Sequence, residues 1–443
     1  MIGVLTFVWG AVAYLMRHRQ TFLTVVIGSA LTDAFNLYLG ESVFSVAGGL
    51  GAVVLLHRRG IDATFARRAG PLFIVLALPV VVGFYFVAVE PFDDPYAAYR
   101  ATTQQLGFKY VVQVLRIPEI ALAAYAAYVG VSAHANPRGA LLRSFSQLVT
   151  LVAVATAIDF LSGDALKALL FERTTDDRVT GLSVEPRQLA REMGLLLLTL
   201  LTVMSHRLRE TRTRWLAFAA ILLLLGTYSV SGLATTALVT FGYLVYRYPR
   251  DYRTYLAPVA FVGVAAIAIS TNGAIRWHVE QRTVKKLQTA LLNYVPNAPI
   301  WVSGLEVFDG AAVAFFYNNP TYLALGTGPN LINIPSSAYV SRYQRIIFPY
   351  GLVATPHMGL ISMISNGGIA FVLLQLLVWA RFVRRLSPKP ELATFVCLVF
   401  VFNLIVTVSY LYFAAALALG IQVAEARAQQ MHPEWQLTGG TQL

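Results

Sequence analysis

Residues 71–89 read PLFIVLALPVVVGFYFVAV, a run without a single charged side chain. A helix needs roughly 20 apolar residues to cross the hydrocarbon core of a bilayer. Similar runs recur near 2–16, 21–38, 42–56, 108–132, 144–162, 188–206, 215–231, 233–247, 255–271, 356–380 and 392–424. Because the last run is long enough for two short helices, the sequence predicts an all-α integral membrane protein with about 12–13 transmembrane helices.

The composition supports this class. Of 443 residues, 57% are hydrophobic and 13% are charged, and the mean hydropathy is +0.62; soluble domains carry about 25% charged residues. The net charge of +12 lies mostly in short connectors, where it orients helices and attracts anionic lipid, so it implies no nucleic-acid partner. The single Cys397 excludes an intrachain disulfide and a cysteine-based metal site. No cleavage site follows the first run, which we expect to be retained as a span.

Basic residues occupy every second connector. They lie at Arg17–Arg19, His57–Arg59 with Arg67 and Arg68, Arg138 with Arg143, 206–214, 246–253 and 381–385. The positive-inside rule places these connectors in the cytoplasm. The opposite face then carries loops near 90–107, 163–187 and 272–355. We expect one polytopic membrane domain over residues 1–443, without internal repeats.

The loop at 272–355 is cationic although it lies on the face that the rule leaves poor in Lys and Arg. It contains Arg276, Arg282, Lys285, Lys286, Arg342 and Arg345 against Glu280, Glu306 and Asp309. Cations placed against this bias indicate an anionic ligand.

A second cationic cluster follows the loop at 163–187. Arg178, Glu185, Arg187 and Arg191 surround the expected start of a membrane helix, and Gly181 and Pro186 are typical of a turn followed by a helix N-terminus. Free N–H groups and guanidiniums together favour phosphate binding. The alternative is that these charges only anchor the helix at the interface.

His357 opens the next apolar run, directly after the large loop. A neutral imidazole at the boundary between water and lipid has a suitable ordinary pKa for a general base. An imidazole that only caps or anchors the helix is the alternative.

Two charged pairs compete with these candidates. Asp93 and Asp94 are suited to a divalent metal, although adjacent acids in a loop are usually solvated turn residues. Arg116 and Glu119 are three residues apart, hence on one side of a helix. We interpret them as a structural ion pair inside the bundle, with Arg116 reaching a lipid phosphate as the alternative.

Two small-residue segments complete the set. Residues 227–232 break an apolar run with small and hydroxyl side chains, which favours tight helix packing over a re-entrant turn. Residues 325–330 contain two glycines but lack the Lys-Ser/Thr and the strand context of a nucleotide phosphate loop. We expect these glycines to let the backbone turn near the membrane surface.

Taken in order, four features of residues 140–385 resemble the O-antigen ligase/polymerase superfamily of bacterial membrane glycosyltransferases. They are the Arg178-x-x-Gly181 turn with Glu185-Pro186 and a helix, the Ser229-Val-Ser-Gly232 break, the Gly326-x-Gly328 pair, and His357 followed by Gly368. Ligases usually carry Asn, Ser or Gln after the histidine, and a second glycine at the position of Phe371; here Met358 follows His357. These departures favour a polymerase. Residues 301–325 lack the arginine that some polymerases place before the glycine pair.

The resemblance implies a GT-C-like membrane glycosyltransferase in the bacterial inner membrane, with its active site and the loops 163–187 and 272–355 on the periplasmic face. It implies metal-independent, inverting transfer of an undecaprenyl-pyrophosphate-linked oligosaccharide to another lipid-linked repeat unit, without a cofactor. Glu185 or His357 would be the base. The pyrophosphate would be held by Arg178, Arg187 and Arg282, with Arg191, Arg276 and Arg345 as further cations.

The acceptor glycolipid decides between two activities. In the alternative to a polymerase, an O-antigen ligase, the acceptor is lipid A-core. A polymerase would have a chain-length regulator as a partner. The rival from another class is a flippase for lipid-linked sugars, which should show two similar halves and charge along a central cavity. No halves repeat in this sequence, and its polar residues gather on one face.

Overall fold

The computed structural model describes residues 2–39, 42–92, 94, 96–100, 105–162, 182–183, 185–227, 229–248, 298–349, 351–352, 356–407 and 410–431, together with 273, 277 and 280. Helices predominate in this part of the chain, as the apolar runs predict. The run at 255–271 lies outside the described residues.

Within the described ranges, five helical segments are long and apolar enough to cross a membrane, which fits a membrane protein. They are α4 and α5 together (Ala63–Ile74 and Ala77–Ala88), α6 (Leu106–Ser132), α7 (Pro137–Leu161), α19 (Gly359–Leu386) and α21 (Leu411–Met431). Shorter apolar helices are α1 (Ile2–Leu15), α3 (Val46–Arg58) and α20 (Pro390–Ile405). The run at 392–424 therefore forms two helices, as its length predicts.

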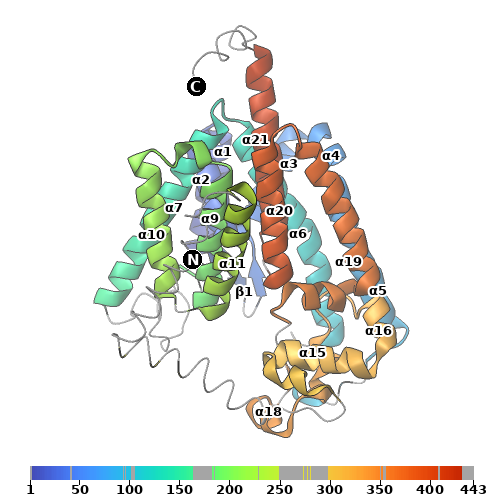
Figure 1. Ribbon diagram of the computed structural model, residues 1–443. Coiled ribbons are helices and arrows are strands. Elements are labelled where there is room, and N and C mark those ends of the chain that lie inside the picture. The colour runs from blue at the N-terminus through green and yellow to red at the C-terminus, as the bar shows by residue number, and fades with distance from the viewer. Residues whose placement is uncertain are drawn as a thin grey trace.

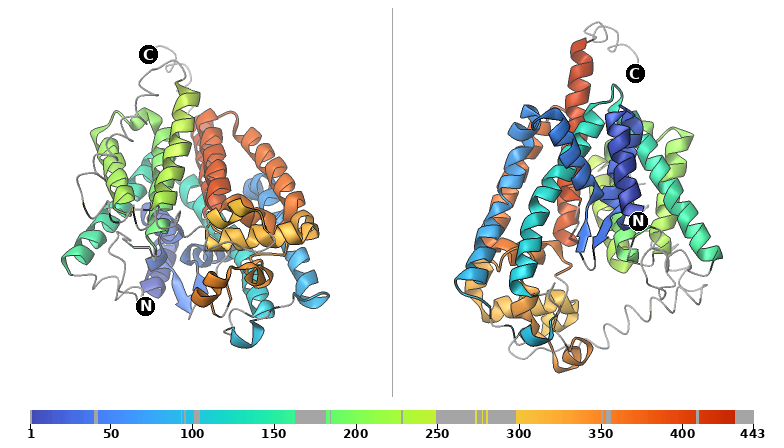
Figure 2. Two further views of the ribbon diagram at one scale, coloured as in Figure 1. Left: turned by 60° about the horizontal axis from the view of Figure 1, so that its bottom comes forward. Right: turned by 180° about the vertical axis from the view of Figure 1, so that it is seen from behind.

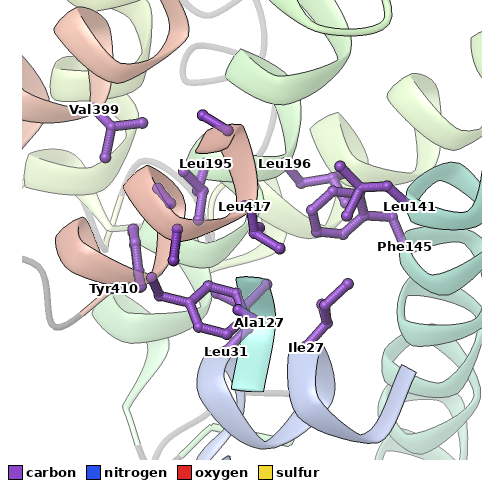
Figure 3. Packing of buried hydrophobic residues seen from close by; sticks show 14 of the residues in the cluster. Ile27, Leu31, Ala127, Leu141, Phe145, Leu195, Leu196, Val399, Tyr410 and Leu417 are labelled. Atoms are coloured by element: carbon purple, nitrogen blue, oxygen red, sulfur yellow. The ribbon is translucent and has the colours of Figure 1, made fainter. Parts of the chain in front are cut away.

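The remaining bundle helices are α2 (Arg19–Leu31), α9 (Pro186–Thr202), α10 (Thr211–Gly226) and α11 (Val230–Arg247). Buried side chains from α2, α6, α7, α9, α20 and α21 meet in one hydrophobic core (Figure 3). Alanines line much of this contact, including Ala126 and Ala127 on α6 and Ala414–Ala416 on α21. Small side chains let helix backbones approach closely, which favours packing between membrane helices.

The apolar run at 21–38 departs from the prediction of a single helix. α2 ends at Leu31, and the chain continues through a 3₁₀ turn into an antiparallel hairpin of β1 (Leu37–Leu39) and β2 (Ser42–Phe44). The Asn36 side chain accepts from Val46 N at the start of α3 and donates to Thr32 O. These polar contacts reverse the chain, so the described part of the chain contains one short hairpin besides its helices.

The basic connectors gather at one end of the bundle, named the basic end here. Arg138 at the start of α7 pairs with Glu425 of α21 at 2.6 Å and with Glu391 of α20. Arg385 at the end of α19 donates to the backbone oxygens of Arg67 and Arg68. Basic residues occur in every second connector because successive helices run in opposite directions, which brings every second connector to the same end of the bundle (Figure 1).

The opposite end carries a small helical subdomain, the cap, formed by residues 298–352 as far as they are described (Figures 1 and 2). It contains η7 (Ile300–Gly304), α15 (Val307–Asn318), α16 (Pro320–Leu325), α17 (Asn333–Ser336), η8 (Ser337–Tyr339) and α18 (Arg342–Ile347). Its own hydrophobic clusters include Ala312, Phe315, Phe316 and Ile332. This part of the predicted loop is therefore a folded unit.

The cap docks into a break in α19. Gly367 and Gly368 have non-helical backbone angles, and Gly368 has φ 70° and ψ −172°. The cap fills the gap, since Thr327 N donates to Ser365 O at 2.7 Å and Gly328 N donates to Asn366 O at 3.1 Å. Gly326 thus allows close backbone packing against Gly367 and Gly368 of α19, whereas Gly328 allows close packing against Gly83 of α5.

We predict that Gly368→Ala destabilises the protein, because its conformation is essentially restricted to glycine and a Cβ there would lie 1.9 Å from Ala324 O. The expected loss in free energy of unfolding is about 1–3 kcal/mol, more if the cap detaches. Gly242→Ala is the matched control, since Gly242 is helical with open space around it. Thermal unfolding of both variants in detergent measures the difference, and equal midpoints would contradict the docking role of Gly368.

Candidate functional site

The cationic cluster lies at the start of α9, as the sequence predicts. Glu185 is the exposed N-cap residue and Pro186 occupies the first helical position. Arg187 and Arg191 are four residues apart on α9, hence on one side of the helix. Arg178, Arg276 and Arg282 lie outside the described residues.

The cap contributes a carboxylate to this helix start. Glu306, the N-cap residue of α15, contacts Arg187 Nη2 through Oε1 at 3.3 Å. Its other oxygen, Oε2, lies 2.9 Å from His357 Nδ1. The two atoms are close enough for an ion pair, but Nδ1 and this oxygen do not meet the geometric criteria for a hydrogen bond. One carboxylate thus joins two residues predicted separately, Arg187 and His357.

Asp309 fixes the backbone beside His357. Its side chain is 2% exposed, and its Oδ1 accepts from Met358 N at 2.9 Å. Burial raises the pKa of the Asp309 carboxyl, and the bond from Met358 and the nearby His357 oppose this rise only in part. The imidazole also meets the ring of Phe308 edge-on, with centroids 5.2 Å apart. These contacts give His357 a defined place at the start of α19.

The start of α19 is also held by the connection between α20 and α21. Thr407 N donates to His357 O at 2.9 Å. A Cβ on Gly359 would collide with Asn403 O near the end of α20, so only glycine lets the two helices come this close. The backbone around His357 is therefore set by the cap on one side and by the α20–α21 connection on the other.

Several buried donors in this region have no partner. Among the described residues, nothing accepts from Arg191 Nε and Nη2, and Thr407 Oγ1 and Tyr410 Oη make no hydrogen bond. Tyr410 is 4% exposed and interacts electrostatically with Arg191. A buried polar group without a partner costs about 1–3 kcal/mol. Several such groups around one histidine indicate a ligand with acceptor oxygens.

A metal ion is the second occupant to consider. Donor atoms of Glu306, Asp309 and His357 all lie within 4.8 Å of one another. Carboxylate and imidazole ligands suit divalent transition metals. However, Glu306 already contacts Arg187 and His357, and Asp309 accepts from the backbone. The guanidinium of Arg187 would repel a cation, so the set is better suited to proton transfer.

The other acidic candidates have structural roles. Asp94 pairs with the Arg100 guanidinium at 2.6 Å and accepts from Tyr96 N, and Asp93 lies outside the described residues. The predicted ion pair between Arg116 and Glu119 is wrong for the described structure. Glu119 instead accepts from Ser45 N at the start of α3, because this helix N-terminus needs an acceptor.

Two further predictions have clear positions. Arg345 on α18 is exposed and donates to Ala338 O within the cap; no ion pair or hydrogen bond joins it to the described residues around His357. The break at 227–232 serves packing, as predicted, since Ser229 caps α11 and a Cβ on Gly232 would lie 2.4 Å from Ala190 Cβ on α9.

Sequence reasoning missed Glu306, Asp309, Thr407 and Tyr410 as members of the site. Glu306 and Asp309 form an acidic pair with a spacing of three inside a cationic loop, which is a usable signal. Thr407 and Tyr410 bring hydroxyls into the apolar run at 392–424, as residues 227–232 do in theirs. Comparison with protein families, curated proteins and solved structures found no match to this chain.

We predict that Asp309→Asn gains stability relative to the wild type as pH rises. A raised folded-state pKa means that stability from this carboxyl is present at low pH and is lost as pH rises through that pKa. Asn keeps an acceptor for Met358 N without the charge. Unfolding midpoints from about pH 4 to about pH 8 measure the effect.

Asp62→Asn is the control with opposite sign. Burial raises the pKa of Asp62, but hydrogen bonds from Phe65, Tyr128 and Thr64 outweigh it and lower the pKa. Stability from Asp62 is thus present at high pH and is lost as pH falls through the folded-state pKa. A wild type that gains stability relative to Asp309→Asn between about pH 4 and about pH 8 would contradict the prediction. Loss of that gain in EDTA would identify a cation at Asp309.

Proposed function

We propose that this chain is a membrane glycosyltransferase that acts on a polyprenyl-pyrophosphate-linked oligosaccharide, and specifically a glycan polymerase. The observation that carries the proposal is the set of buried, unpartnered donors on Arg191, Thr407 and Tyr410 beside the His357–Glu306 pair. A pyrophosphate leaving group gathers negative charge in the transition state, and fixed donors in a low-dielectric site stabilise it.

The location follows from charge. With the basic end in the cytoplasm, the cap lies in the periplasm of a bacterial inner membrane. The predicted 12–13 spans and the GT-C-like architecture belong to this proposal. The five membrane-length helices and the position of the cap opposite the basic connectors support it.

His357 is the better base of the two candidates. It takes the proton from the acceptor sugar hydroxyl, and Glu306 stabilises the imidazolium that forms. The acceptor oxygen forms a bond to the anomeric carbon while the bond from that carbon to the pyrophosphate oxygen breaks. The leaving pyrophosphate keeps the electron pair, and attack from the opposite side inverts the anomeric centre. Glu185 is exposed at the start of α9, and the interaction seen for it within the described residues is electrostatic, with Arg191.

The two arginines of α9 then have different roles. The charge of Arg187 is balanced by Glu306, so Arg187 positions this carboxylate. Arg191 keeps unpartnered donors and binds the pyrophosphate directly. Arg178 and Arg282 remain proposed as further pyrophosphate ligands, and Arg276 and Arg345 as outer cations of the loop.

We predict that Tyr410→Phe lowers transfer without lowering stability. The substitution keeps the ring and removes a hydroxyl that has no partner, so the unfolding midpoint should stay equal or rise. Loss of one transition-state donor should reduce kcat by about 100–1,000-fold. Transfer and thermal unfolding are both measured on the purified protein.

Tyr412→Phe is the matched control two residues away. Its hydroxyl accepts from Gln375 Nε2 at 3.1 Å, so this variant should lose about 0.5–1.5 kcal/mol of stability and keep its kcat. The site assignment fails if Tyr410→Phe behaves like Tyr412→Phe.

The function itself is tested with purified lipid-linked repeat units as the only substrate. A polymerase gives a ladder of longer glycans, in EDTA as well as without it, and a ligase gives product only when lipid A-core is added. A flippase would give no ladder under any condition, which would overturn the proposal.

His357→Gln should reduce kcat by about 100–10,000-fold with little change in the donor KM.

A further inference from the structure

A polar stripe runs along one side of α6, far in sequence from the site described above. Lys109, Gln113 and Arg116 are spaced four and three residues apart, so they lie on the same side of the helix. Of the charged residues in α6, only Glu119 lies outside this group. Charged side chains in membrane helices are costly and are often functional.

Lys109 is buried, and among the described residues its Nζ has a single, neutral hydrogen-bond partner. Its side chain is 7% exposed, and Nζ donates to Asn333 Oδ1 at 2.5 Å. An ammonium has three donors, so one amide oxygen leaves it undersatisfied. The charged residues that interact with it electrostatically, Arg100 and Arg116, are both cations.

Arg100 is occupied and does not share an acid with Lys109. Its guanidinium binds Asp94, Leu352 O at 2.9 Å and Ser337 Oγ at 3.0 Å. This cation is therefore balanced by Asp94 and locks the cap to the segment before α6.

Arg116 is the second unbalanced cation. Within the described ranges, no hydrogen bond or ion pair joins its guanidinium to another residue. Glu119, one turn further along α6, is used by the backbone of Ser45. Gln113 between the two cations accepts from Asn330 Nδ2 at 2.8 Å, which leaves its own amide N–H groups for an acceptor.

The stripe lies at the level of lipid headgroups. α6 has 27 residues and is about 40 Å long, whereas the hydrocarbon core is about 30 Å thick. One end of α6 reaches the cap (Figure 2). There Lys109 and Gln113 form hydrogen bonds with Asn333 and Asn330. Arg116 is about two turns deeper than Lys109, within reach of the interface when its long side chain extends.

We infer that Lys109, Gln113 and Arg116 form a second anion site, which binds the phosphate headgroup of a membrane lipid. Lys109 is buried and Arg116 is half-buried, and no carboxylate among the described residues pairs with either of them. Two such cations need an anion, and the headgroup layer supplies phosphate. This inference rests on the proposed polymerase, where the ligand is the pyrophosphate of the acceptor carrier. The cap borders both sites, with Glu306 at the first and with Asn330 and Asn333 at the second.

The stoichiometry of pyrophosphate binding tests the inference. The probe is radiolabelled farnesyl pyrophosphate, with the protein in nanodiscs of phosphatidylcholine. The wild type should bind two probes, and Lys109→Met combined with Arg116→Gln should bind one. Lys109→Arg combined with Arg116→Lys should bind two again, because the charges remain. Arg381→Gln, an exposed cation at the basic end, is the control and should bind two.

A second arm distinguishes the source of the phosphate. In nanodiscs of phosphatidylglycerol, a second site that prefers phospholipid no longer binds the probe, either in the wild type or in Arg191→Met. Native mass spectrometry then shows that the α6 double variant retains one phospholipid fewer than the wild type. A site for the carrier keeps its probe in both lipids. If the α6 variant binds as much probe and as much phosphatidylglycerol as the wild type, the inference is overturned. Arg191→Met with both probes retained would instead overturn the proposed donor site.

If the double variant fails to fold, Arg116→Gln alone decides, since Arg116 is half-buried and makes no hydrogen bond or ion pair within the described part of the chain. Unchanged probe affinity in Arg116→Gln would overturn the second site. A weakening by about tenfold or more is the expected result for removing one guanidinium from a phosphate.

Discussion

The carboxylate of Glu306 joins three segments that are far apart in the sequence. It belongs to the cap and contacts Arg187 on α9 and His357 before α19. Without it, the arginine and the histidine would have no common partner, and the cap would lose its polar contact with α9. This carboxylate is one of several attachments of the cap, together with the glycine break of α19 that receives Thr327 and Gly328 and the contacts of Arg100, Lys109 and Gln113.

The protein accepts unsatisfied polar groups at this end. Arg191, Thr407 and Tyr410 keep buried donors without partners. At the basic end, Glu391, Glu425 and Gln422 engage the arginines, although His134 and Thr213 there also have a buried polar atom without a partner. Buried donors without partners reduce the stability of the protein when no ligand is bound. Such groups are typical of functional sites, where they are available to bind a ligand. The unbalanced cations of α6 follow the same pattern, and the cap borders both groups.

The sequence predicts the helical class, the alternation of charge and the start of α9 because each rests on local chemistry. Apolar length, connector charge and the Glu185-Pro186 pair are readable without knowing which helices touch. The hairpin after α2 was not predicted, because it depends on contacts between Asn36 and the start of α3. The ion pair of Arg116 and Glu119 was predicted from spacing alone, whereas the N-terminus of α3 takes Glu119 instead.

The sequence by itself determined which residues are cationic, which helices are membrane-like, and that Arg187, Arg191 and His357 are candidates for one chemistry. Only the tertiary structure decided their roles. It placed Glu306 between Arg187 and His357, which balances one arginine and leaves Arg191 with free donors. The physical reason is that charge compensation is a pairwise property across distant segments. The type of a residue determines which ligands it can bind. Its neighbours in space determine whether its charge and its hydrogen-bond donors are already used within the protein.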